Sequence, residues 1–354
     1  MKVHFLVNSL VAGGAERVLI LLANYFEEQG QDVTIITFNE PEVFSANKNV
    51  KRIRLHGGKI KNHMVRSTKN LASLYFKKKN RPDVLIPFMT QTNLIGIIIG
   101  KLYGIKVVSA EHNNHLKEIN SIGNFTRNQA YKYTDALTVL TGFDKKFYKS
   151  KNVNVHIMPN PSTFSVFKET ERNRKKLILA VGDLNRYHHK GFDNLIPIIA
   201  PVLKKHSDWK LKLVGGGDEG MSFITNLVEK HNIADQVIFE GYSTEVAKLM
   251  SESEIYIMTS RFEGLPMVLL EAMSQGMACI SFDCKTGPSD IITDSKNGIL
   301  IEDQNFDAMS NGLDQLINNP EQRKELAANG INSLDNFKID VIYNKYLDIF
   351  ESIL

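Results

Sequence analysis

The chain alternates short apolar segments with longer amphipathic segments, and this pattern runs twice along the sequence. In the first run, apolar segments predict strands at 2–7, 33–38, 50–55, 84–88, 106–110, 136–140 and 155–158. Helical periodicity between them predicts helices at 15–28, 66–79, 92–103 and 125–133. The strands lack polar alternation, which is typical of parallel strands covered by helices on both faces.

The second run begins after 158–176, a stretch rich in proline, serine and charge that we interpret as an interdomain linker. Strands are predicted at 176–181, 211–214, 237–240, 254–258, 277–282 and 298–301. Helices are predicted at 192–205, 305–318, 321–334 and 337–353. Two such runs predict an α/β protein with two doubly wound domains facing each other across a cleft, where ligands bind beyond the carboxyl ends of the strands.

Length, cysteine content and charge limit the number of domains and the classes of protein that fit this pattern. The chain has 354 residues, enough for two domains, and no apolar run reaches the length of a membrane span. Cys279 and Cys284 are the only cysteines, so we expect no disulfide framework, no zinc site and a cytoplasmic location. Residues 1–165 hold 23 Lys and Arg against 11 Asp and Glu, whereas the remainder is net acidic, which favours a boundary near residue 160.

Much of the positive charge lies between Lys48 and Arg81, including the run Lys77-Lys78-Lys79. One interpretation is attraction to an anionic membrane surface, at about 1 kcal/mol per basic residue. The alternative is a solvated helix face. Nucleic acid is not expected as a partner, because few aromatic residues are interleaved and no zinc-finger or RNP-type signature occurs.

The string SRFEGLPMVLLEAMSQG places Glu263 and Glu271 on either side of Pro266. Proline suits the first turn of a helix, so Glu263 is expected in the preceding loop and Glu271 within the helix. The free N–H groups of that turn attract phosphate. Two hydroxyl-binding carboxylates flanking a phosphate site predict a nucleotide-sugar pocket, whereas the plain alternative is a pair of solvated glutamates.

Glycine clusters follow three predicted strands, at Gly13-Gly14, at 215–217 and at Gly264. Glycine lets a backbone approach a phosphate or sugar closely, although a simple turn explains a Gly-Gly pair as well. The spacing GxGxxG and the Walker-type GK[ST] are both missing from the sequence. These absences argue against a dinucleotide dehydrogenase and against an NTPase.

Two further segments carry candidate side chains after predicted strands. In VGDLNRYHHKGFDN, Arg186 and Lys190 could offset the charge of a diphosphate leaving group, or they are ordinary surface cations. In SAEHNNHL, residues 111–113 are expected to point into the cleft. His112 there either polarises a sugar hydroxyl or serves as a packing or capping group.

Taken together, these strings resemble the family 4 type of GT-B glycosyltransferases over nearly the whole chain. The glutamate pair matches the E-x7-E motif of the family, and LVAGGAERV resembles its glycine loop. The resemblance implies domains at 1–163 and 164–336, with a last helix at 337–354 crossing back to the first domain. One departure is Gly182-Asp183-Leu184, where the family usually has Gly-Arg-Leu, so Arg186 is assigned the role of the missing arginine.

The resemblance also implies roles for individual residues. The catalytic set is His112, Glu263, Arg186 and Lys190. Donor-binding residues are Gly13, Gly14, Gly215, Gly216, Gly264, Leu265, Pro266, Met267, Val268 and Glu271, of which Glu271 binds the ribose. Residues on the acceptor side are Glu16, Glu111 and Asn113.

The activity implied is transfer of a hexose or N-acetylhexosamine from a nucleotide sugar, with UDP as the expected nucleotide and with retention of configuration. No cofactor or metal is expected. The acceptor would be a saccharide or lipid-linked saccharide in polysaccharide, capsule or glycolipid synthesis, reached from the cytoplasm at the inner membrane face. Two alternatives stay open: a non-catalytic GT-B partner or scaffold, and a related GT-B sugar-nucleotide epimerase or phosphorylase.

Overall fold

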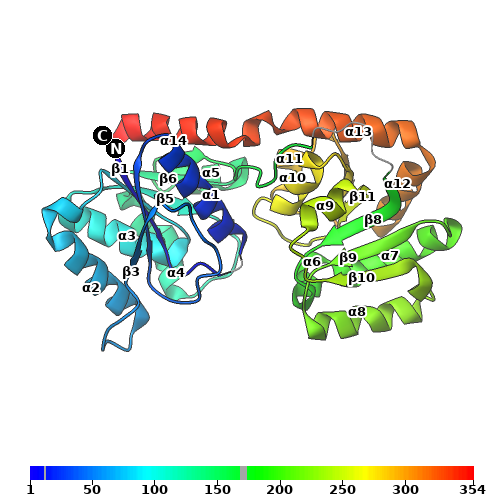
Figure 1. The fold of residues 1–354 in the computed structure, drawn as a ribbon, viewed down its shortest axis with the longest axis horizontal. Helices are drawn as coiled ribbons and strands as arrows, with labels where there is room; N and C mark the ends of the chain where they lie inside the picture. The colour runs from blue at the N-terminus through cyan, green and yellow to red at the C-terminus, as the bar shows by residue number, and fades with distance from the viewer. Residues whose placement is uncertain (12, 168–173) are drawn as a thin grey trace. The chain divides into compact units, whose positions relative to one another are not determined.

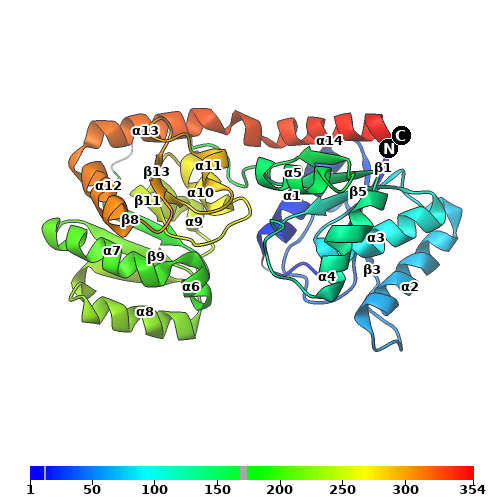
Figure 2. The same ribbon diagram turned by 180° about the vertical axis from the view of Figure 1, so that it is seen from behind.

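Parallel sheets covered by helices make up both halves of this α/β protein (Figures 1 and 2). The computed structural model describes residues 1–11, 13–167 and 174–354. The chain divides into unit 1, residues 1–163 with 337–354, and unit 2, residues 164–336. The predicted linker therefore includes six residues, 168–173, that lie outside the described residues. Within the described ranges, no helix has the length and apolar character needed to cross a bilayer.

The sheet of unit 1 is entirely parallel, with the strand order β3-β2-β1-β4-β5-β6-β7. Its strands are β1 (Lys2–Val7), β2 (Asp32–Thr37), β3 (Lys51–Arg54), β4 (Val84–Pro87), β5 (Lys106–Glu111), β6 (Ala136–Val139) and β7 (Val155–Ile157). The order reverses between β1 and β4. Ligands of doubly wound sheets bind at such a switch point, beyond the carboxyl ends of the strands.

The main helices of unit 1 are α1 (Gly14–Glu28), α2 (His63–Phe76), α3 (Thr90–Tyr103), α4 (Ser121–Phe125), α5 (Gly142–Lys149) and α14 (Ile339–Ile353). The short turns are η1 (Lys78–Asn80), the π-helical η2 (Thr126–Ala130) and η3 (Tyr131–Tyr133). The helix predicted at 125–133 is thus wrong in form, because α4, η2 and η3 follow one another there. Helix α2 starts earlier than predicted, since the Asn62 side chain accepts from the Val65 N–H and caps it.

Aromatic packing holds the C-terminal helix α14 against α1 within unit 1. The Phe26 ring lies 4.7 Å from the Tyr343 ring and 6.0 Å from the Phe350 ring, centroid to centroid. The Gln31 amide also donates to the Tyr343 hydroxyl at 3.1 Å. The opposite face of the sheet packs against α2 and α3 through a buried cluster that includes Leu6 and Leu71.

Unit 2 has a second parallel sheet, with the order β10-β9-β8-β11-β12-β13. Its strands are β8 (Lys175–Val181), β9 (Lys210–Val214), β10 (Val237–Gly241), β11 (Ser253–Met258), β12 (Ala278–Asp283) and β13 (Ile299–Glu302). The longer helices are α7 (Phe192–Lys205), α8 (Asp218–Lys230), α10 (Met267–Ser274), α12 (Phe306–Asn318) and α13 (Pro320–Asn332). The shorter elements are η4 (Leu184–Arg186), α6 (Tyr187–Lys190), η5 (Ala234–Gln236), α9 (Val246–Ser251), α11 (Pro288–Ile291) and η6 (Ser333–Phe337). Here the order reverses between β8 and β11, so the loops after these two strands mark the expected ligand edge.

A buried histidine in β1 makes the stability of unit 1 depend on pH. His4 is 2% exposed, and its Nδ1 lies 2.8 Å from the Tyr75 hydroxyl oxygen. Burial, and then the charge of Lys2, lower the pKa of His4 from 6.5 to about 3. Native His4 therefore stays neutral over a pH range in which the unfolded chain takes up a proton.

We expect this histidine to destabilise the protein as the pH falls below 6.5. Between pH 6.5 and 4.5 its contribution to the free energy of unfolding should drop by about 1–3 kcal/mol. The free energy of unfolding can be measured with denaturant at several pH values. Over this window it should fall less steeply with decreasing pH for His4→Asn than for the wild type. Parallel curves for the two proteins would contradict the assignment.

Candidate active site

Three loops of unit 2 meet backbone to backbone at the carboxyl ends of their strands. Gly191 has a φ of +70°, and a Cβ there would lie 1.8 Å from the Thr259 carbonyl oxygen. Gly215 has a φ of +151°, and a Cβ there would lie 1.8 Å from the Gly182 carbonyl oxygen. Only glycine permits such approaches. The loops after β8, β9 and β11 are thereby held together, and Lys190 is brought beside the segment that follows Thr259.

Lys190 and Glu263 form an ion pair at this junction. The Lys190 Nζ lies 2.8 Å from Glu263 Oε1, and the side chains are 19% and 10% exposed. The Thr286 hydroxyl donates to the Glu263 carbonyl oxygen and fixes the loop from the other side. An ammonium group has three N–H donors, so Lys190 can bind a second anion while it keeps Glu263.

Helix α10 separates the two glutamates as the motif predicts. Glu263 lies in the loop before it, and Glu271 lies within it, 4% exposed. Pro266 is the N-cap residue rather than a member of the first turn, so the helix begins one residue later than expected. The first N–H groups of a helix have no acceptor within it, and such an end can bind an anion, so the role predicted for Met267 and Val268 is compatible with their place at the start of α10.

The electrostatics of a buried tyrosine connect the two carboxylates. Tyr256 lies in β11 and is 2% exposed. Its pKa is raised well above the ordinary value, first by burial and then by negative charges that include Glu263 and Glu271. Both glutamates therefore lie near enough to β11 for their charges to act on Tyr256. Burial likewise raises the pKa of the Cys284 thiol to about 12, which excludes a reactive thiolate there.

The provisional phosphate ligand Arg186 is exposed at the end of η4, and its backbone N–H donates to the Asp183 carbonyl oxygen at 3.1 Å. The Asp183 side chain accepts from the Asn185 N–H at 3.0 Å and so caps η4. The aspartate at the family's arginine position is accordingly a capping residue. The phosphate role of Arg186 stays a prediction.

Arg261 is a positioning residue that sequence reasoning did not single out, although it lies two positions before Glu263. Its guanidinium donates to both carboxylate oxygens of Asp193, at 2.7 and 3.0 Å, and to the Asn194 side chain at 2.7 Å. Its backbone N–H donates to the His189 carbonyl oxygen at 3.0 Å. These contacts join the loop that carries Glu263 to the start of α7.

Unit 1 contains a pocket of about 370 Å³ at the carboxyl ends of β1, β4 and β5. Among the residues lining it are Asn8, Glu16, Met89, Gln91, Asn113 and Asn120. Glu16 and Asn113, both predicted on the acceptor side, therefore share one pocket. Amide groups with apolar neighbours are a suitable lining for a sugar, which offers hydroxyl groups and C–H faces.

The glycine loop at the start of α1 makes room for the side chain of Glu16. Gly13 is the N-cap of α1, and a Cβ there would lie 2.3 Å from Glu16 Oε2. The Glu16 side chain thus folds back over Gly13, and burial raises its pKa. Gly14 is the exposed first residue of α1.

His112 does not line that pocket but a cavity of about 10 Å³ that Glu111 also lines. Its ring is stacked on Phe88, with the centroids 4.7 Å apart, and among the described residues its Nδ1 has no hydrogen-bond partner. Burial lowers the pKa of His112 to about 4, so the imidazole is neutral near pH 7. Neutral His112 can still accept or donate a hydrogen bond, and its catalytic role stays a prediction.

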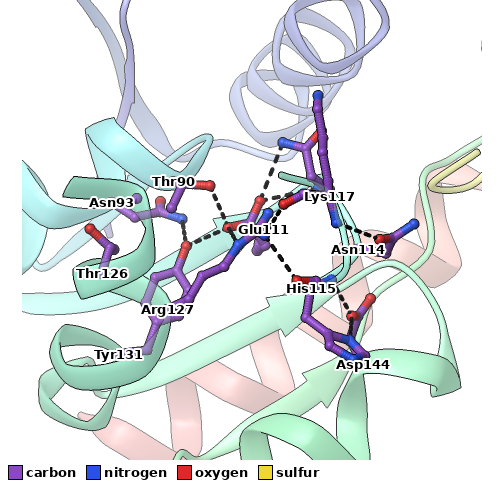
Figure 3. Close-up of polar contacts among 12 residues, drawn as sticks. Thr90, Asn93, Glu111, Asn114, His115, Lys117, Thr126, Arg127, Tyr131 and Asp144 are labelled. Atoms are coloured by element: carbon purple, nitrogen blue, oxygen red, sulfur yellow. Dashed lines mark hydrogen bonds and ion pairs between the residues drawn. The ribbon is translucent and has the colours of Figure 1, made fainter. Parts of the chain in front are cut away.

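Glu111 corrects an expectation, because its side chain does not point into open space. It is 2% exposed and accepts from the Thr90 hydroxyl at 2.6 Å and the Tyr131 hydroxyl at 2.7 Å (Figure 3). The Asn113 N–H donates to its other oxygen at 3.1 Å. A carboxylate removed from water needs such partners, so Glu111 holds Thr90, Tyr131 and Asn113 together at the end of β5.

Comparison with known proteins identifies the family of this chain. Residues 162–333 match the family described as Glycosyl transferases group 1, and residues 12–162 match Glycosyltransferase Family 4. An uncharacterised glycosyltransferase of Haemophilus influenzae is 31% identical, with 98% of each chain covered. A Campylobacter jejuni enzyme named GalNAc-α-(1→4)-GalNAc-α-(1→3)-diNAcBac-PP-undecaprenol α-1,4-N-acetyl-D-galactosaminyltransferase is 30% identical over 100% of this chain and 99% of its own.

Solved structures show the same fold. The apo form of the lipopolysaccharide outer core galactosyltransferase WaaB has a TM-score of 0.80 at 21% identity, with 100% of both chains covered. TarM has a TM-score of 0.82 at 16% identity, with 99% of this chain and 98% of its own covered. The fold is therefore GT-B, and the chain belongs to the group 1, family 4 type of glycosyltransferases.

Proposed function

We propose that this glycosyltransferase moves a hexose or N-acetylhexosamine from a UDP-sugar to a saccharide acceptor, with retention of configuration. The observation that carries the proposal is the Lys190–Glu263 pair beside the start of α10. A cation, a carboxylate and free helix N–H groups are what a sugar diphosphate requires. Named relatives act in the synthesis of amylovoran and of a lipid-linked saccharide, which supports a cell-surface glycan as the product.

In this proposal the diphosphate lies at the α10 N-terminus, near Gly264 and Leu265. The N–H groups of Met267 and Val268, together with Lys190, stabilise the charge that grows on the departing diphosphate. Arg186 is the second cation if its exposed side chain turns inward. No metal is needed where such donors are in place.

The two glutamates divide the recognition of the donor between them. Glu263 accepts hydrogen bonds from sugar hydroxyls, and Glu271 accepts them from the ribose. Gly215, packed against Gly182, and Gly216, where an added Cβ would meet only Tyr242 at 3.7 Å, are assigned to the nucleotide side of the donor site. UDP as the nucleotide is supported by the solved complexes of the structural neighbour HepE with UDP and with UDP-glucose.

The acceptor is assigned to the pocket of unit 1, where Glu16 and Asn113 face one space. Departure of the diphosphate from C1 runs ahead of attack by the acceptor on the same face, which retains configuration. His112 is proposed to polarise or align the acceptor hydroxyl as a neutral group.

The basic part of unit 1 is proposed to bind the anionic inner face of the membrane, where a lipid-linked acceptor would lie. Lys77, Lys78 and Lys79 are all exposed, and the neighbouring Phe76 is 77% exposed. Arg66 is half-buried, and its guanidinium donates to the Asn39 side chain at 3.2 Å, so the three exposed lysines carry this proposal. Cations beside an exposed aromatic ring suit a lipid headgroup region.

Removing the Lys190 charge should cost activity without loss of the fold. Lys190→Ala is expected to lower kcat for release of UDP from a UDP-sugar by about 100-fold, because one stabilising group of the leaving diphosphate is lost. Glu263→Gln should lower transfer while UDP itself still binds by calorimetry. NMR of the product should show the anomeric configuration of the donor.

The matched control is Lys175→Ala, which breaks the exposed Lys175–Glu252 ion pair of the same unit, 2.7 Å long. It should leave kcat unchanged. Wild-type turnover in both Lys190→Ala and Glu263→Ala would refute the donor site.

Membrane binding is tested by sedimentation with vesicles of phosphatidylglycerol and phosphatidylcholine. Reversing three charges, with Lys77→Glu, Lys78→Glu and Lys79→Glu together, should weaken binding to the anionic vesicles by about 100-fold or more, at about 1 kcal/mol per residue. Lys204→Glu, Lys210→Glu and Lys230→Glu form the control set, since these lysines are exposed in unit 2. Equal binding of wild type to pure phosphatidylcholine would exclude an electrostatic surface.

A further inference from the structure

A buried arginine that no motif indicates lies under one wall of the unit 1 pocket. Arg127 is 3% exposed and belongs to the π-helical turn η2. Its Nη1 donates to the Lys117 carbonyl oxygen at 2.8 Å and to the His115 carbonyl oxygen at 3.2 Å (Figure 3). Its Nε lies 3.8 Å from Glu111 Oε2, and both side chains are almost completely buried.

The Glu111 carboxylate also contacts residues of the neighbouring elements. Tyr131 lies four residues after Arg127 and reaches the same oxygen of Glu111, while the Asn93 side chain donates to the Tyr131 hydroxyl at 2.9 Å. The Asn113 N–H binds the other oxygen of Glu111. One buried ion pair therefore joins the end of β5, the start of α3, the 112–117 loop and η2.

The segment held in this way is the pocket wall. Asn113, Ile119, Asn120 and Gly123 line the pocket, and the carbonyl groups bound by Arg127 lie between the first two of them. Thr90, which donates to Glu111, lines the pocket as well. A second anchor is Asp144, whose Oδ1 accepts from the His115 N–H at 2.7 Å.

The π-helical backbone of η2 is consistent with a role in holding the pocket wall. A π turn inserts an extra residue into a helix and is frequent at functional sites. Here it follows α4 directly, and Arg127 within it and Tyr131 just after it both approach Glu111. The ion pair from Arg127 and the hydrogen bond from Tyr131 converge on one buried carboxylate, and together with the two carbonyl groups bound by Arg127 they restrain the 113–123 wall.

We propose that Arg127, through Glu111, is the positioning residue that holds the 113–123 wall in the shape that receives the acceptor sugar. This inference rests on the proposed function. Arg127 touches neither substrate, so it acts on acceptor binding and leaves the donor chemistry of unit 2 unaffected.

Two variants test this role while limiting the risk of unfolding. Arg127→Lys keeps the charge but replaces the planar fork by a point charge. Arg127→Met with Glu111→Gln removes both charges together, so that no unpaired buried charge is left. Asn128→Ala is the control, because Asn128 is exposed on the same turn and its side chain donates to the Asn124 carbonyl oxygen rather than to the 113–119 loop.

The first measurement is hydrogen exchange of the 113–123 amides in the full-length protein. It should be about tenfold faster in both variants than in the control. The second uses UDP-N-acetylgalactosamine with octyl N-acetylgalactosaminide. The KM for the octyl glycoside should rise about tenfold, while release of UDP without acceptor stays within about twofold of wild type.

Unchanged exchange in both variants would overturn the inference, as would an equal loss of UDP release and of transfer. A wild-type protein that binds no nucleotide sugar would instead refute the proposed function. In that case the exchange result still decides whether Arg127 positions the wall.

Discussion

The contact between Gly191 and the Thr259 carbonyl group is the constraint on which the ligand edge of unit 2 depends. Any side chain at Gly191 would separate the loops after β8 and β11. Lys190 and Glu263 lie on these two loops, so their 2.8 Å contact exists only because the backbones touch. Arg261 then locks the arrangement by its paired hydrogen bonds to Asp193. The ion pair is a consequence of backbone packing, so the fold of unit 2 itself sets the geometry of the proposed donor site.

The two ion pairs that matter in this protein differ in burial, and the difference fits different tasks. Lys190 and Glu263 are partly exposed, so water or a ligand can share their charges. Arg127 and Glu111 are almost fully buried, and breaking such a pair is strongly destabilising. The first pair is suited to exchanging partners during binding, whereas the second is suited to keeping one shape.

Repeating patterns were the predictable part of this structure. Apolar strands without polar alternation indicated parallel sheets, and the E-x7-E string placed Glu263 in a loop and Glu271 in a helix, as the structure has them. Side-chain partners were not predictable in the same way. Glu111 was expected to point into the cleft, but it is the last residue of β5 and its contacts come from Thr90 and Tyr131, which are distant in sequence.

The segment 121–133 shows why such contacts escape a reading of periodicity. A pattern of 3.6 residues predicts a continuous helix at 125–133, whereas the π turn at Thr126–Ala130 shifts the phase by one residue. In this conformation Arg127 contacts two carbonyl groups and a carboxylate. Only the folded chain brings these three groups together. An arginine in the sequence looks like a surface cation, because burying it is costly unless all its partners are in place. Tertiary contacts therefore decide local structure here, and they do so beside the pocket proposed to hold the acceptor.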